Sequence, residues 1–173
     1  MEFSQVLFSR RSCRRYTGEP VSDEALNTVL AAANAAPVGM GAYQTIHLTV
    51  IRSRDFLDVL SKAAGAFMKR EDDPLYGTPM IILVSAKPGV PPTIEFQNTG
   101  AIIENMMLQA TDLGLGSVYL MGAVAALKTR PELIGQLKLP EGFVPIAAMA
   151  LGRSAEAAPR RTPEQKIATD YLD

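Results

Sequence analysis

The spacing of apolar side chains along the chain predicts a series of helices and strands. Phe3, Val6 and Leu7 recur at the helical period, so a short helix is expected over residues 2–9. Ile46, Leu48 and Val50 alternate with polar residues, which predicts a half-buried strand over 45–51. The other expected helices cover 23–36, 55–69, 96–113 and about 131–137, and the other expected strands cover 80–84, 117–120 and 143–151.

Two helix starts carry recognisable end signals. Ser22 is typical of an N-cap, with acidic residues directly after it, and the helix it begins must stop before Pro37. The run Thr129-Arg130-Pro131-Glu132 has the spacing of a capping box and is expected to open a helix. The helix at 96–113 has the widest apolar surface and is therefore expected to be central.

The order of these elements indicates the fold class. Two helices precede the first strand, so the pattern is not a regular alternation of strand and helix and favours an α+β fold. A length of 173 residues fits one domain, here residues 1–152, followed by a polar C-terminal arm over 153–173.

Charge and composition restrict the functional classes. A net charge of -1 leaves no basic excess for general nucleic-acid binding, so no nucleic acid partner is expected. No apolar stretch approaches the ~20 residues that span a bilayer, and no signal-peptide pattern is visible, so no membrane association is expected. One cysteine, Cys13, fits a reducing, cytoplasmic location, and one histidine with one cysteine argues against a zinc site, so no metal is expected.

The strongest local feature is the run from Arg10 to Tyr16, in which four of the first six residues are arginines. Arginine forks and a serine hydroxyl match phosphate oxygens well. A solvated cluster at the C-terminal end of the preceding helix would explain the same charges. Both interpretations are open on the charge pattern alone.

The remaining polar residues give no catalytic side chain. The chain has no dinucleotide-binding glycine motif after a strand and no phosphate-binding loop. His47 lies within a strand and is interpreted as a packed or surface residue, and Asn105, Gln109 and Asp112 are interpreted as a solvated or interhelical face. A redox cofactor such as FMN would explain an enzyme-sized fold with arginine-bearing loops and no acid–base pair, because the cofactor carries the reactive atoms.

The ordered motifs resemble those of the nitroreductase family of FMN-dependent oxidoreductases. Phe8 to Tyr16 with Pro20-Val21 is similar to the opening motif, and Ala36-Pro37, a glycine loop and Gln44 are similar to the second. Gly114 to Leu120 resembles the third motif, and the strand to Gly152 with the Pro159-Arg160-Arg161 segment resembles the end of the family's chains. The resemblance implies a three-layer fold with a mostly antiparallel sheet, and a homodimer with the flavin at its interface.

The resemblance also implies a set of FMN contacts. The phosphate and ribityl contacts would come from the opening motif and the tail, namely Arg10, Arg11, Ser12, Arg14, Arg160 and Arg161. The ring contacts would come from Met40, Gly41 and Gln44 of one subunit and from Met121 and Gly122. No side-chain nucleophile is required, because the flavin N5 carries the chemistry, and Cys13 is expected to be structural.

The implied activity is transfer of hydride or electrons from NAD(P)H to a nitroaromatic, a quinone or a related small acceptor. The loop Val38 to Gly41 and the Gln44-Thr45-Ile46 segment depart from common family sequences. They leave open a non-enzymatic flavin-binding protein, which would store or sense flavin on the same fold. A dehalogenase or cofactor-cleaving relative would need substrate-lid residues that the sequence does not identify.

Overall fold

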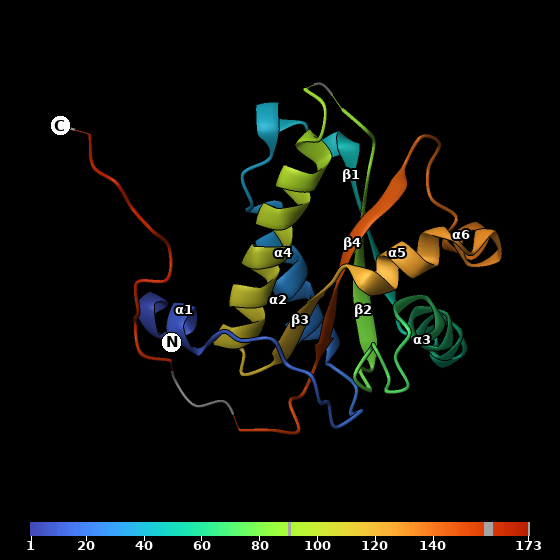
Figure 1. Cartoon of the computed structure of the whole chain (residues 1–173), viewed down its shortest axis with the longest axis horizontal. Coiled ribbons are helices and arrows are strands. Elements are labelled where there is room, and N and C mark those ends of the chain that lie inside the picture. Colours follow the sequence, from blue (N-terminus) through green and yellow to red (C-terminus); the bar gives the residue numbers. More distant parts are fainter. Residues whose placement is uncertain (90, 158–160, 173) are drawn as a thin grey trace.

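A single antiparallel sheet organises the chain (Figure 1). The computed structural model describes residues 1–89, 91–157 and 161–172. The strands are β1 (Ile46–Ile51), β2 (Met80–Ala86), β3 (Gly116–Leu120) and β4 (Val144–Gly152), in the order β1-β2-β4-β3. All three strand pairs are antiparallel, so the predicted α+β class with an antiparallel sheet is confirmed.

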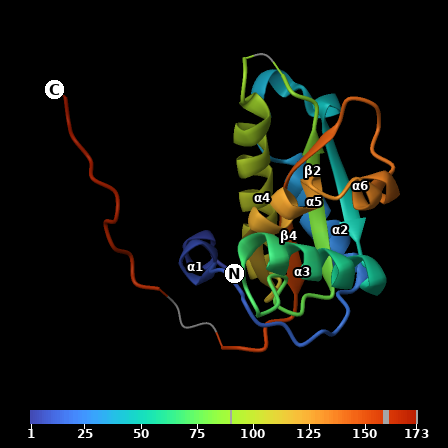
Figure 2. The same cartoon turned by 45° about the vertical axis from the view of Figure 1, so that its right-hand side comes forward.

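Helices cover both faces of the sheet and make three layers (Figure 2). One face packs against α2 (Asp23–Asn34) and the predicted central helix α4 (Ile94–Asp112). The other face packs against α3 (Arg54–Met68), α5 (Gly122–Lys128) and α6 (Pro131–Leu137). The short helix α1 (Phe3–Ser9) lies outside the sheet and contacts α4.

The two cores follow from the alternation of side chains along β2, which is buried along its whole length. Ile81 and Leu83 join the core under α3 and α5, whereas Ile82 and Val84 join the core under α2 and α4. Each fully buried aliphatic side chain contributes about 1.5–3 kcal/mol, so this strand contributes to both cores and ties the three layers together.

The helix-end predictions have different outcomes. Ser22 caps α2 as expected, because its Oγ accepts a hydrogen bond from the Ala25 amide at 3.2 Å. The capping-box prediction for Thr129 is wrong. Thr129 ends α5, and its Oγ1 donates to the Ala126 carbonyl at 2.8 Å. The next helix, α6, starts at Pro131 after Arg130, which makes no side-chain cap.

Two segments outside the helices and the sheet are the connection from α2 to β1 and the C-terminal tail. Two short 3-10 turns, η1 (Gly39–Gly41) and η2 (Tyr43–Thr45), connect α2 to β1. The tail over 161–172 runs away from the body of the fold (Figures 1 and 2), and Ile167, Tyr171 and Leu172 are exposed along it. Across the described ranges, no helix is both long enough and apolar enough to cross a membrane.

Candidate functional site

The basic segment after α1 is attached to the open edge of β3. Ser12 pairs with Ser117 in a parallel bridge, and the Cys13 amide donates to the Ser117 carbonyl at 2.8 Å. Tyr16 forms an antiparallel bridge with Ser154, just beyond the end of β4. The arginine-rich motif is therefore held as an extended segment at one end of the sheet.

Arg10 and Arg161 line one cavity of about 460 Å³, between α1, α4 and the start of the tail. The Arg161 amide donates to the Phe8 carbonyl at 3.0 Å, and its Nη2 donates to the Leu7 carbonyl at 3.2 Å. These bonds bring the tail to α1 of the same chain. We call this cavity the Arg10–Arg161 pocket; its lining also includes Phe8, Glu104, Thr162, Glu164 and Lys166.

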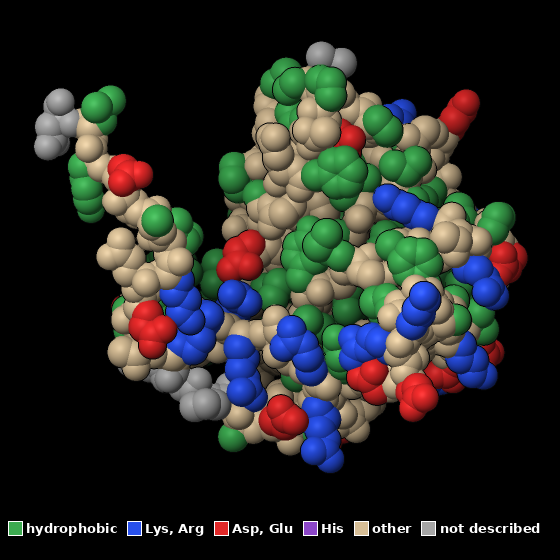
Figure 3. All heavy atoms as spheres, in the orientation of Figure 1, with side chains coloured by type: hydrophobic (Ala, Val, Ile, Leu, Met, Phe, Trp, Pro, Cys, Tyr) green, Lys and Arg blue, Asp and Glu red, His purple; other side chains and the backbone are tan. Residues whose placement is uncertain are grey.

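The charges in the Arg10–Arg161 pocket favour an anion. Arg10, Arg161 and Lys166 supply three cations against the carboxylates of Glu104 and Glu164. The Arg10 Nε lies 3.1 Å from Glu104 Oε1, which orients the guanidinium. In the view of Figure 3, Lys and Arg side chains, with Asp and Glu side chains between them, are spread across the lower half of the molecule. A guanidinium held through Nε keeps its terminal N–H groups available for a bidentate contact.

The structure does not bring every predicted phosphate ligand to this pocket. Arg11 lines a separate cavity of about 380 Å³, together with Cys13 and Arg153, and its Nη2 donates to the Ala157 carbonyl at 2.6 Å. Arg14 is exposed, and Ser12 is partly buried at its bridge. Arg160 lies outside the described residues. Of the predicted phosphate set, the structure gathers Arg10 and Arg161.

Met121 and Gly122 lie where β3 ends and α5 begins. Met121 is 71% exposed. A Cβ on Gly122 would lie 2.3 Å from the Met68 Sδ, so glycine lets the end of α3 pack closely against this turn. Met121 lies four residues beyond Ser117, which is about 13 Å along the strand. A ligand anchored near Ser12 would have to be elongated to reach Met121.

The glycine loop lies at the other end of α4 (Figure 1). Met40 has a φ of 57° and is 79% exposed, and Gly41 and Gln44 are exposed beside it. Gly39 packs against Ile94, whereas Arg10 pairs with Glu104, ten residues further along α4. This separation corresponds to about 15 Å along the helix axis. The predicted ring contacts from this loop therefore do not meet the Arg10–Arg161 pocket within one chain.

These geometries can be compared with known proteins. The family model described as "Nitroreductase family" matches residues 7–153. The chain belongs to the nitroreductase family. A relative from Archaeoglobus fulgidus, named for a proposed NADH dehydrogenase or NAD(P)H nitroreductase activity, is 32% identical over 156 residues, covering 87% of this chain and 84% of the relative.

Two solved nitroreductases share the fold. One, from Desulfitobacterium hafniense with bound FMN, has a TM-score of 0.86 at 24% identity and covers 100% of this chain and 99% of its own. Another, from Bacteroides fragilis with bound FMN, has a TM-score of 0.82 at 26% identity and covers 99% of this chain and 100% of its own. The predicted nitroreductase-like three-layer fold is confirmed.

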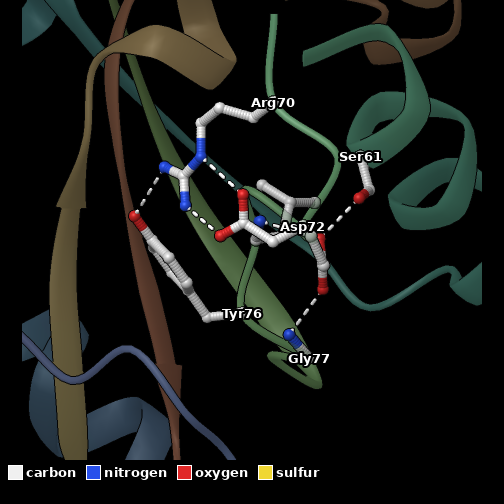
Figure 4. A network of polar contacts seen from close by, with 7 residues as sticks. Ser61, Arg70, Asp72, Tyr76 and Gly77 are labelled. Atoms are coloured by element: carbon white, nitrogen blue, oxygen red, sulfur yellow. Dashed lines mark hydrogen bonds and ion pairs between the residues drawn. The ribbon is translucent and has the colours of Figure 1, made fainter. Parts of the chain in front are cut away.

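Beside the Met121–Gly122 turn, this nitroreductase has a polar network that the sequence did not reveal (Figure 4). Arg70 forms a two-pronged ion pair with Asp72, with Nε–Oδ1 at 2.9 Å, and its Nη1 lies 3.4 Å from the Tyr76 hydroxyl. The hydrogen bonds from Arg70 lower the pKa of Asp72. The network begins two residues after Met68, which contacts Gly122, and it fixes the loop between α3 and β2 next to the Met121–Gly122 turn. The turn residues around Asp73-Pro74 and Gly77 were the available signal.

Asp73 anchors the second half of the same loop. Its carboxylate accepts hydrogen bonds from the Ser61 hydroxyl at 2.5 Å, the Leu75 amide at 2.8 Å and the Gly77 amide at 2.6 Å. These side-chain bonds to two backbone N–H groups take the place of the backbone–backbone bonds of a regular turn. The loop between α3 and β2 therefore has a defined shape although it contains no helix or strand.

Several polar residues outside the proposed FMN contacts are held by packing or by hydrogen bonds within the fold. Cys13 is buried, and its Sγ donates to the Arg15 carbonyl at 3.3 Å. Burial, followed by the proximity of Cys13, raises the pKa of Tyr16. His47 packs edge-on against Phe143 with 5.9 Å between ring centroids, and the Asn105 amide donates to the Ala32 carbonyl at 3.3 Å. The packed interpretation of His47 and the interhelical interpretation of Asn105 are confirmed.

Proposed function

We propose that this chain is an FMN-dependent oxidoreductase that passes a hydride or electrons from NAD(P)H to a nitroaromatic, a quinone or a related acceptor. The observation that carries the proposal is the convergence of Arg10 and Arg161 on one anion-sized, net positive pocket. Membership of the nitroreductase family and the FMN bound in the Bacteroides fragilis structure support the choice of cofactor.

The residues that could hold FMN follow one another in the order that the molecule requires, from its phosphate through its ribityl chain to its ring. The terminal N–H groups of Arg10, and those of Arg161 that do not bond to Leu7, suit the phosphate. The Ser12–Ser117 edge would follow the ribityl chain, and the first backbone N–H groups of α5, which lack partners within the helix, would face the polar edge of the ring. The distance of about 13 Å from Ser12 to Met121 requires a ligand with an anion at one end and a ring at the other.

FMN held at this site would supply the redox chemistry, which is hydride transfer between NAD(P)H and the acceptor. The chain's own residues bind and orient. Arg10 and Arg161 would fix the phosphate, and the start of α5 at Gly122, which packs closely against the end of α3, would present backbone N–H groups to the ring. The first backbone N–H groups of α5 would stabilise the negative charge that the ring carries when it is reduced.

The assembly we propose is a homodimer with a cytoplasmic location. Met40, Gly41 and Gln44 lie on a turn about 15 Å along α4 from the Arg10 pair, and, as the family resemblance implies, a second copy of the chain would supply them to a ring bound at Met121. The tail beyond Arg161, with exposed Ile167, Tyr171 and Leu172, would pack on that copy as an arm. The single Cys13 fits a reducing compartment.

Purification tests the proposal directly. The protein should carry a yellow chromophore that acid releases as FMN, and it should oxidise NADH or NADPH steadily when a quinone is added. FMN binding without turnover would favour the flavin-storage alternative. A colourless protein that does not bind added FMN would contradict the proposed cofactor.

A further inference from the structure

A buried amide on α4 holds the glycine loop in place. Asn98 is only 6% exposed, and its Oδ1 accepts a hydrogen bond from the Gly39 amide at 2.9 Å. The contact joins the first part of α4 to a turn 59 residues away in sequence. A Cβ on Gly39 would lie 2.6 Å from the Ile94 Cδ1, so the turn is pressed directly onto the helix.

The turn has a backbone shape that needs support. Met40 is not glycine but has a φ of 57°, in the left-handed region that L-residues rarely adopt. Its side chain is 79% exposed, so it gains little from packing on its own chain. Local bonds from Gly41 to Val38 and from Ala42 to Gly39 close the turn on itself. The Asn98 bond connects this closed turn to α4.

We propose that Asn98 is a positioning residue that sets where Met40 and Gly41 meet the flavin ring. This inference rests on the proposed function. Without the Asn98 acceptor, the turn keeps its local bonds but loses its hydrogen bond to α4, and the partly buried Gly39 amide loses its partner. The effect should appear at the ring and in the use of substrate, because the Arg10–Arg161 pocket lies further along α4.

Three substitutions separate this role from general stability. Asn98→Leu keeps the size of the side chain and removes the acceptor. Asn98→Asp keeps an oxygen acceptor, so it should keep the hydrogen bond to the Gly39 amide, although the buried carboxylate lowers the free energy of unfolding. Asn105→Leu is the matched control, because Asn105 also lies on α4 and also bonds to the backbone of another element, at Ala32.

The holoprotein and its variants are compared by hydrogen exchange over residues 38–43, by FMN titration and by steady-state kinetics. Asn98→Leu should speed exchange in this segment about tenfold, as expected for one lost hydrogen bond. It should also raise the KM for the quinone about fivefold and shift the visible spectrum of the flavin, while the FMN Kd stays within about twofold. Asn98→Asp and Asn105→Leu should leave the exchange of this segment at the wild-type rate.

An Asn98→Leu protein with wild-type exchange and wild-type KM would overturn the inference, and so would an equal effect of Asn105→Leu on residues 38–43. If the leucine variant does not fold, Asn98→Ala, which removes the acceptor without adding apolar bulk, gives the same comparison. A wild-type protein that lacks FMN and turnover would instead overturn the proposed function, and this inference with it. The two failures are distinguished by the activity of the wild type.

Discussion

Removing the Arg10 guanidinium gives the sharpest test of the Arg10–Arg161 pocket. A charge-assisted hydrogen bond contributes about 1.5–3 kcal/mol, and about 1.4 kcal/mol corresponds to a tenfold change in Kd. Arg10→Ala should therefore weaken FMN binding about ten- to hundredfold. Arg14→Ala is predicted to have the same direction, although Arg14 is exposed and should contribute at the lower end of this range.

The ion pair with Glu104 makes a second contribution to the loss of FMN affinity in Arg10→Ala. When Arg10 is removed, the Glu104 carboxylate stays in the pocket without the guanidinium that lies 3.1 Å from it. A negative charge then faces the phosphate, so the loss in Arg10→Ala includes repulsion as well as lost bonds. The double variant Arg10→Ala/Glu104→Gln removes that repulsion and should recover part of the affinity. The recovery should shrink in high salt, because the pocket is open to solvent.

Titration of the apoprotein with FMN, followed by flavin fluorescence, measures these effects. Arg11→Ala is the informative comparison, because the structure places Arg11 in a separate cavity and its affinity should stay within about threefold of wild type. Arg130→Ala controls for charge, because Arg130 also holds a carboxylate through Nε, at 2.6 Å from Glu132, on a distant helix. Equal losses in Arg10→Ala and Arg11→Ala, or none in Arg10→Ala, would refute the assignment.

Three further predictions test the parts of the fold that support the site. In a urea titration, Gly116→Ala should lower the free energy of unfolding by about 1–3 kcal/mol, because a Cβ there would lie 2.7 Å from the Cys13 Sγ. Gly135→Ala is the control: a Cβ there has no atom within 4 Å, so the same titration should show a free energy of unfolding about 0.5–1 kcal/mol higher. Burial raises the pKa of Tyr16, so its stabilising effect is complete below the ordinary value of 10.0 and is lost as pH rises above it. Wild type should therefore lose stability relative to Tyr16→Phe by about 1.4 kcal/mol per pH unit above pH 10, and a difference independent of pH would contradict this. Truncation after Gly152 removes Arg161 and should weaken FMN binding at least about tenfold. It should also shift the dimer toward monomer in sedimentation velocity. A truncated protein with unchanged FMN affinity and unchanged assembly would exclude this role of the tail.

Periodicity predicted the long elements of this fold because each one buries a regular face. The second half of the central helix buries apolar residues at a helical spacing, and β2 is apolar at six of its seven buried positions, so most of their burial follows from the sequence. Helix α5 was missed because it has only seven residues, begins with Gly122 and carries small alanines. The capping-box spacing at Thr129 marked the start of α6 correctly but gave Thr129 the wrong role, since a threonine can also bond backward to a carbonyl of the helix it ends.

The site was partly predictable for a different reason. Arg10 and Arg161 were identified through the resemblance of whole motifs, and the structure places both in one pocket. Arg11 could not be told apart from Arg10 by sequence, because neighbouring side chains in a non-helical segment diverge only once the Ser12–Ser117 bridge fixes the backbone. The turn residues around Asp73 indicate a loop at this point but not the Arg70–Asp72 ion pair, because a run of mixed charges is typical of any solvated loop.

Helix α4 fixes the spacing of the candidate site. It carries Glu104 against Arg10 in its second half and Asn98 against the glycine turn in its first half, and a helix of this length cannot shorten the distance between them. Within a single chain, the pocket for the anion and the turn that presents Met40 therefore stay apart. A two-fold interface built on α4 would bring the first half of one copy of this helix toward the second half of the other, because such an interface pairs each patch with its reverse. On this geometry each flavin ring would be enclosed only in the dimer, so substrate use, rather than phosphate affinity, should depend on the contact between the two copies.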